Sequence, residues 1–423
     1  AAKPAAAPLM QSPPAILVRR SRLPYYARLA AGAAGIGAAG FVVVSGIGFF
    51  NLRHTLVESA PTLIAQFKDA RDALTNLETA RAHESLSDIA SRLGTITGES
   101  DRYGFSQLAA LWGTVVPQIQ RASDAFTQLV SLSEAALDTT AQLAEIQDQG
   151  VPWLMRREGD QLIARIDTLR ERLQTVGSAS ASLAQNVSTN VAAGDLLGFD
   201  ATLYKTTRFL DALAAWLKQP DDHYLLIMFE NSSELRPAGG FLGSYAVVTL
   251  DPLGVKGISV EDIYDADGQF DRKIAPPRAL QPITDRLAAR DANWFFDFPA
   301  SAAKVIELLE SSKIYRERQV VFDGALAVTV DVVERLIELT GPIELPEYDL
   351  TLTAANFLAE VQREVETGYD NRVLNEPKLI LKRAAPILIE RLANLSAADR
   401  AAVLKQLQKE VTNRNLMLYF KDI

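Results

Sequence analysis

Apolar residues recur every three or four positions through the first half of the chain and gather in short runs in much of the second half. Residues 55–217 follow the first pattern, which predicts amphipathic helices. One of their apolar stripes comprises Leu162, Ile166, Leu169, Leu173 and Val176. Glycines within residues 94–104 and the Gly-Val-Pro sequence at 150–152 predict breaks between helices. We therefore expect residues 53–219 to form a bundle or stalk of several antiparallel helices.

The short apolar runs begin after Pro220, where a proline and two aspartates mark a boundary. They predict strands at residues 224–229 and 245–250, and alternation of apolar with polar residues predicts a third strand at 255–263. A helix, a strand, a helix and a further strand are predicted after them, at residues 300–311, 320–328, 331–339 and 341–345. This order favours a mixed α/β domain over residues 220–423, so that the chain as a whole belongs to the α+β class.

An uncharged segment, residues 29–52, is long enough to cross a hydrocarbon core of about 30 Å as a helix. Four arginines between residues 19 and 28 precede this segment, and only Arg53 follows it closely. By the positive-inside rule, the disordered Ala- and Pro-rich tail at residues 1–28 is cytoplasmic, and the helical region and the α/β domain are extracytoplasmic. The segment has no clear cleavage site, which favours an uncleaved single-pass signal anchor in the cell membrane. The lipid bilayer is therefore one expected partner.

Small residues recur four positions apart in this segment, as at Ala33 and Gly37. Such spacing allows two helices to approach closely, and it would support self-association or contact with another envelope or membrane protein. The alternative is a lone anchor in which the small residues only lower the hydrophobicity. Both interpretations stay open.

The composition excludes several function classes. The formal net charge of −9 argues against nucleic acid as a partner. The absence of cysteine excludes disulfides, thiolate metal sites and cysteine nucleophiles, and it fits an extracytoplasmic bacterial protein. The three histidines are widely separated, so no Ser-His-Asp set can be assembled, and no P-loop or dinucleotide fingerprint is present.

A polar loop between the first two predicted strands is a candidate anion site. Its glycines, Gly239 and Gly240, allow backbone N–H groups to approach a ligand, and Arg236 could pair with a phosphate or carboxylate. Glu234 belongs to the same candidate site. The alternative is a hairpin connection in which Glu234 and Arg236 pair with each other or contact solvent.

An acidic run follows the third predicted strand. Its carboxylates, Asp262, Asp265 and Asp267, could supply oxygen ligands to Mg²⁺ or Ca²⁺, although the spacing does not match an EF-hand. The alternative is a solvated acidic turn, which we weigh slightly above a metal site. No other cofactor is expected.

An aromatic-rich turn occupies residues 290–299. Exposed aromatic rings there could line a groove for a lipid or a sugar. A core-filling cluster in which Asp297 caps the following helix is the favoured alternative.

Three separated motifs, at residues 234–245, 323–328 and 336–343, resemble the uncharacterised bacterial family catalogued as domain of unknown function 4012. The resemblance covers about residues 221–423. It implies a membrane-anchored extracytoplasmic protein, in agreement with the topology expected from residues 29–52. Members of the family generally extend further, so we leave open whether the α/β domain is truncated at residue 423.

The α/β region is also similar in layout to the LytR-CpsA-Psr transferases, which attach glycopolymers carried on polyprenyl pyrophosphate to the cell wall. By this similarity, Arg236 would handle phosphate and Asp262, Asp265 and Asp267 would handle phosphate and metal. Arg372 and Arg383 would assist, in a stretch that also contains Lys378 and Lys382. The sequence departs from that family where residues 243–245 replace its Asp-Thr and residues 263–265 replace its Pro-Arg-Asp.

Two functions follow from these observations. We favour a non-catalytic, membrane-anchored protein of the cell envelope whose α/β domain binds a partner protein, a lipid or a glycan. The helical region would then act as a spacer or an assembly surface. The alternative is an enzyme, a glycopolymer transferase acting on polyprenyl-pyrophosphate-linked substrates.

Overall fold

The computed structural model describes residues 54–421 apart from gaps at 56–57, 60, 75, 103–116, 187–191, 271–272 and 375. The chain divides into two compact units. The first comprises Ala1–Ser59 and Thr95–Gln120, and its described residues are helical. The predicted tail and membrane span at residues 1–52 lie outside the described residues. Within the part that the structure describes, no helix is both long and apolar enough to cross a membrane.

The second unit comprises Ala60–Gly94 and Arg121–Ile423 and begins with helices. Residues 61–74 are helical. The longer helices of the chain are α2 (Thr79–Arg102), α4 (Pro117–Met155), α5 (Gly159–Asn186) and α6 (Ala192–Leu217), of which the last residues of α2 and the first of α4 belong to the first unit. The predicted stripe from Leu162 to Val176 is confirmed, because all five of its residues are buried in one apolar cluster with residues of α4 and α6.

The predicted break at residues 150–152 is displaced, because helix α4 continues through Gly150 and Pro152 and ends at Met155. Helix α2 continues through Gly94 and Gly98 and ends at Arg102, within the predicted range of 94–104. A proline removes one hydrogen bond from a helix, and a glycine costs about 1 kcal/mol relative to alanine. Burial of Trp153 and Leu162 beside this stretch compensates for such losses, because tertiary packing supplies most of the stability of a helix.

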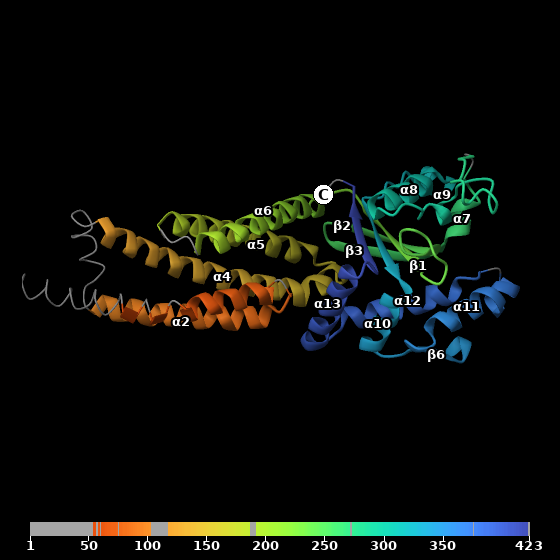
Figure 1. Cartoon of the computed structure of the whole chain (residues 1–423). Helices are drawn as coiled ribbons and strands as arrows, with labels where there is room; N and C mark the ends of the chain where they lie inside the picture. The colour runs from red at the N-terminus through yellow and green to blue at the C-terminus, as the bar shows by residue number, and fades with distance from the viewer. Residues whose placement is uncertain are drawn as a thin grey trace, which may run out of the picture. The chain divides into compact units, whose positions relative to one another are not determined.

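Strands begin directly after α6 and form a five-stranded sheet in the order β3-β2-β1-β4-β7. The three predicted strands are confirmed as β1 (His223–Asn231), β2 (Phe241–Asp251) and β3 (Gly254–Asp262). These pair antiparallel, whereas β1 pairs parallel with β4 (Gly324–Thr329). Strand β7 (Leu416–Phe420) completes the sheet beside β4 (Figure 1).

Helices surround the sheet. After β3 follow α7 (Ile263–Asp267), η1 (Ala289–Asp291), α8 (Phe298–Ser311) and α9 (Lys313–Arg318). After β4 follow α10 (Val330–Thr340), β5 (Ile343–Leu345), η2 (Pro346–Tyr348), β6 (Leu350–Leu352), α11 (Phe357–Thr367), the π-helical turn η3 (Asp370–Leu374), α12 (Leu379–Ala393) and α13 (Ala397–Thr412). The mixed helix and strand content expected from the sequence is therefore confirmed.

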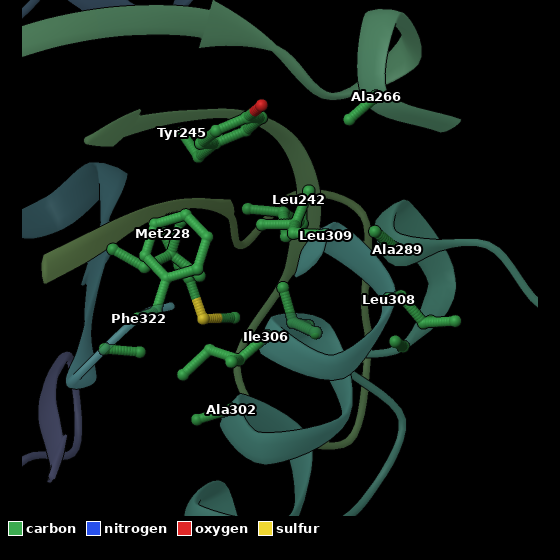
Figure 2. Close-up of a cluster of buried hydrophobic side chains, with 14 of the residues drawn as sticks. Met228, Leu242, Tyr245, Ala266, Ala289, Ala302, Ile306, Leu308, Leu309 and Phe322 are labelled. Carbon is green, nitrogen blue, oxygen red and sulfur yellow. The ribbon is translucent and has the colours of Figure 1, made fainter. Parts of the chain in front are cut away.

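Two apolar cores form around the sheet. In the first, Met228 of β1 and Leu242 of β2 pack with Ile306 and Leu309 of α8 (Figure 2). The second core joins α10, β5, β6, α11 and α12. Side chains alternate between the two faces of a strand, so Phe229 projects from the face opposite to Met228. That opposite face carries the candidate site.

Candidate functional site

A cavity of about 210 Å³ is lined by strands β1, β2 and β4 and by helices α10, α11 and α12. The strands contribute Phe229, Phe241 and Val328, and the helices contribute mainly aliphatic side chains. The apolar helix residues are Val330, Val333, Phe357, Leu358, Val361, Val365, Leu381, Ala384, Ala385 and Leu388. Polar side chains also line the cavity, among them Asn231, Ser244, Gln362 and Glu366. Such a lining suits an apolar ligand, and the volume lies below the roughly 300–1,000 Å³ of pockets that enclose drug-sized molecules. We refer to this space as the apolar cavity.

The helices that line the cavity present a regular apolar stripe to it. In α11, Phe357, Val361 and Val365 recur at intervals of four residues, and in α12 Leu381 and Leu388 lie two turns apart. This spacing is visible in the sequence. Because the walls come from segments more than 100 residues apart, the stripe alone indicates a buried helix face and not a cavity.

One lysine marks the polar rim of the cavity. Lys378 lies at the N-terminal end of α12, and its Nζ would be 3.5 Å from a Cβ atom placed on Gly243. Burial lowers the pKa of Lys378, and the carboxylates of Asp262 and Glu234 oppose this shift. Among the described residues, no hydrogen bond or ion pair holds its ammonium group. A partly buried cation without a fixed counterion is suited to an anionic ligand group.

The predicted anion loop forms a hairpin connection between β1 and β2, as the alternative interpretation proposed. Glu234 is exposed, lines the cavity and accepts a hydrogen bond from Asn231 Nδ2 (3.1 Å). Arg236 does not pair with it; its Nη2 lies 3.4 Å from an Asp291 oxygen. The Arg236 guanidinium also lies 5.0 Å from the centre of the Phe241 ring, which lines the cavity. Arg236 therefore supports the wall of the cavity.

The two glycines of this loop serve close packing of the backbone. Gly239 has a φ of +140°, and a Cβ atom there would lie 2.0 Å from Glu230 Oε2. A Cβ atom on Gly240 would lie 2.5 Å from the Asn231 carbonyl oxygen. Both glycines thus let the loop pack against its own strand.

Glu230 is a buried acid that sequence reasoning missed. Its side chain is 1% exposed, and Oε1 accepts a hydrogen bond from Asn293 Nδ2 (2.9 Å). Oε2 has no hydrogen-bond partner within the described structure. Burial raises the pKa of Glu230 to about 8, partly offset by Asn293. Position 230 gave no signal in the sequence, because a glutamate at a strand end is ordinarily exposed.

The predicted metal ligands have separate roles. Asp262 caps α7 by accepting a hydrogen bond from the Tyr264 N–H (2.9 Å), and Asp265 is exposed. Asp267 is buried and accepts hydrogen bonds from the Ala289 N–H (2.7 Å) and Arg290 Nη1 (3.0 Å). Across the described ranges, no group of three or more acidic or histidine side chains is arranged to hold a metal ion.

The remaining predicted site residues lie on the surface. Arg372 is exposed on η3, and Arg383 is exposed on α12, with its Nε 3.8 Å from a Glu347 oxygen. Neither residue lines the apolar cavity. Of the nine predicted site residues, Glu234 alone belongs to its lining.

The aromatic-rich turn combines both of its predicted roles. Asp297 caps α8 by accepting a hydrogen bond from the Ala300 N–H (3.3 Å), and Phe298 is buried in the first core. Phe295 and Phe296 are exposed. The capping prediction is therefore confirmed, and two rings remain accessible.

Comparisons with known proteins give few matches. No curated protein matches this chain. A crystal structure described as the transcriptional regulator yvhJ from Bacillus subtilis aligns with 15% identity and a TM-score of 0.23, covering 46% of this chain and 99% of that chain. That score is too low to carry an argument, and the similarity in layout to LytR-CpsA-Psr transferases stays a prediction. The model of the family described as "Protein of unknown function (DUF4012)" matches residues 221–365, which confirms the family resemblance inferred from the sequence motifs.

Proposed function

We propose that this protein is a membrane-anchored component of the cell envelope whose α/β domain is a non-catalytic binding module for a lipid-like amphiphile. The observation that carries this proposal is the apolar cavity with Lys378 at its rim. Of the ligands considered from the sequence, a lipid fits this combination best, because most of the lining is apolar and would leave many hydroxyl groups of a glycan without hydrogen-bond partners.

The cavity would hold part of an apolar chain. Each methylene group removed from water contributes about 0.8 kcal/mol, so a few buried methylenes supply several kcal/mol before the entropic cost of binding. Val361, Leu381 and Leu388 would contact such a chain. The volume suits a segment of a long chain, with the remainder outside the cavity.

Lys378 would hold an anionic headgroup. An ammonium that is partly removed from water is stabilised by a charge-assisted hydrogen bond, worth about 1.5–3 kcal/mol. Gly243 leaves room beside Lys378 Nζ, because it carries no side chain. Glu234 and Asp262 lie nearby and would disfavour a headgroup with a high negative charge.

Placement of this module outside the membrane follows from the uncharged segment at residues 29–52 and the arginines that precede it. The helical region would act as a spacer or an assembly surface. Transfer of glycopolymers from polyprenyl pyrophosphate would need, in addition, cations and a metal at the headgroup. Arg236 is paired with Asp291, and Asp267 is paired with Arg290, so the contacts favour binding over transfer.

Native mass spectrometry of the full chain, purified from membranes in detergent, tests this proposal. We expect wild-type protein to retain one amphiphile and Ala385→Phe, which fills the cavity, to lose it. Lys378→Ala should weaken retention of an anionic amphiphile by about 10- to 100-fold, the equivalent of one charge-assisted hydrogen bond.

Lys382→Ala is the matched control, since Lys382 lies one turn further along α12 and pairs with Glu376 at 3.8 Å outside the cavity lining. It should retain the amphiphile. Thermal unfolding of each variant shows whether a variant that does not retain the amphiphile is still folded. Equal retention by the wild type and all three variants would refute the proposal.

A further inference from the structure

The segment between α7 and α8 exposes three large apolar side chains. Ile283 is 81% exposed, Phe296 is 88% exposed and Phe295 is 41% exposed. Their sequence neighbours Leu287 and Phe298 are buried in the first core. The segment is therefore folded against the domain and still presents apolar side chains to solvent.

Hydrogen bonds hold this segment in place. The Asp267 carboxylate accepts from the Ala289 and Arg290 N–H groups and from the Arg290 side chain. Arg286 donates to the carbonyl oxygens of Phe270 (3.3 Å) and Asp267 (3.2 Å). Such a network restricts rearrangement of the backbone that would bury the exposed side chains.

The backbone at Phe295 is fixed separately. Its N–H donates to Ser301 Oγ (2.9 Å), and its carbonyl oxygen accepts a hydrogen bond from the same hydroxyl group (3.0 Å). Ser301 is fully buried in α8. The two adjacent phenylalanines are thus held outward at the start of a helix that Asp297 caps.

The segment also exposes cations. Residues 268–297, the whole stretch between α7 and α8, contain five basic and four acidic side chains, whereas the whole chain carries a formal charge of −9. Lys273 and Arg278 are exposed, and no ion pair involves either of them within the described part of the chain. Exposed apolar side chains in the same segment as exposed cations are typical of surfaces that contact anionic lipid headgroups.

We propose that residues 273–296 dock on an anionic lipid bilayer, with Ile283, Phe295 and Phe296 entering the interface and Lys273 and Arg278 contacting headgroups. A bilayer suits this combination, because Ile283, Phe295 and Phe296 are exposed in the same segment as the exposed cations Lys273 and Arg278. The proposal rests on the proposed placement of the chain at a membrane, but it does not depend on the ligand of the apolar cavity.

The docking segment adjoins the loop that lines the cavity. Arg236 on that loop reaches Asp291, and Asn293 donates hydrogen bonds to both Glu230 and the Gly240 carbonyl oxygen. Docking of residues 273–296 would therefore bring the β1–β2 loop, which includes Glu234, close to the bilayer. An amphiphile could then pass between bilayer and cavity over a short distance.

Single nitroxide labels test the docking, and the absence of cysteine from the chain makes such labelling specific. The labelled variants are Phe296→Cys, Ile283→Cys and Val411→Cys in the full chain, reconstituted in vesicles of equal parts phosphatidylglycerol and phosphatidylcholine. Val411 is the control, an apolar residue of α13 that is 56% exposed. Collision rates with oxygen and with a water-soluble nickel complex report immersion.

We expect labels at positions 296 and 283 to favour oxygen over nickel and the label at 411 to favour nickel. Nickel access at 296 equal to that at 411 would overturn the proposal. Protection of 296 from both reagents would also overturn it, because that result indicates a protein interface.

Charge reversal tests the choice of an anionic surface. Lys273→Glu combined with Arg278→Glu, in the Phe296→Cys background, should lower the ratio of docked to undocked protein by about fivefold or more for each cation lost. Immersion that is unchanged in this variant, or equal in vesicles of phosphatidylcholine alone, would overturn the assignment to an anionic bilayer. Lipid retention in the apolar cavity, measured in the same samples, reports separately on the proposed function.

Discussion

Glu230 carries a buried carboxyl group that links the stability of the α/β domain to pH. Its pKa is raised to about 8 in the folded protein because burial disfavours the carboxylate. An unfolded chain binds this proton less tightly, with a glutamate pKa of about 4.3. The resulting stabilisation is complete below that lower pKa and is lost as the pH rises toward 8.

Glu230→Gln should remove this pH dependence. The amide keeps the shape and cannot ionise, so the variant should lose less stability than the wild type between pH 5 and pH 8. At pH 8 the free energy of unfolding of the variant, relative to the wild type, should rise by a few kcal/mol, at about 1.4 kcal/mol per unit of pKa difference. Thermal unfolding of the full chain at pH 5 and pH 8 measures this difference.

Glu317→Gln is the control, because Glu317 is exposed and lies 3.8 Å from Lys313. It should follow the wild-type pH profile. A steeper loss of stability in Glu230→Gln at pH 8 than in the wild type would contradict the assignment of a neutral acid at position 230.

At the scale of elements, the β1–β2 hairpin depends on close approach between its loop and its first strand. Gly239 has a positive φ and lies against the Glu230 carboxyl group. The pairing register of β1 and β2 shifts between Phe229 and Glu230, at the same end of the hairpin. No side chain fits at position 239 without moving Glu230. The hairpin therefore needs glycine for both conformation and space.

Gly239→Ala should lower the free energy of unfolding by about 1–3 kcal/mol or more, because strain in the backbone adds to a steric clash. Gly257→Ala is the matched control, since Gly257 lies in β3 with open space around the Cβ position and no positive φ. The control should be neutral or slightly stabilising. Urea denaturation of both variants checks this, and an equal effect at the two positions would contradict it.

Local patterns predicted the elements better than their assembly. The short apolar runs at residues 224–229 and 245–250 are a local signal, so β1 and β2 could be found from sequence. The parallel pairing of Leu226 with Ala325 joins positions about 100 residues apart and leaves no local signal. The cavity was missed for the same reason. In the acidic run, Asp262 caps α7 and Asp267 pairs with Arg290, contacts that the spacing of the carboxylates does not reveal.

In the second unit as a whole, Asp323 joins the helical region to the sheet. Its Oδ1 accepts a hydrogen bond from Trp216 Nε1 of α6 (3.0 Å) and lies 3.2 Å from His223 Nδ1. Its Oδ2 accepts from the Tyr224 N–H (2.8 Å). The Trp216 ring also packs on His223, with centroids 4.3 Å apart. One carboxylate thus fixes the end of α6 to the start of β1.

Asp323→Ala should loosen this connection at a cost of about 1.5–3 kcal/mol, because it removes hydrogen bonds to a charged group. Amide hydrogen exchange should accelerate at the end of α6 and the start of β1. Asp222→Ala is the control, since its ion pair with Lys256 (2.7 Å) is exposed and worth at most about 1 kcal/mol. Equal acceleration in both variants would contradict a special role for Asp323.

Helices α10, α11 and α12, which line the apolar cavity, lie in the chain segment that connects β4 to β7. Strands β4 and β7 are neighbours in the sheet. Both ends of this connecting segment are therefore fixed next to each other in the sheet. The entropic cost of closing such a loop rises slowly with its length. Related proteins could thus differ in the length or sequence of this connecting segment, and so in the ligand they accept, while keeping the same sheet. Ligand specificity is therefore expected to vary mainly in the segment between β4 and β7.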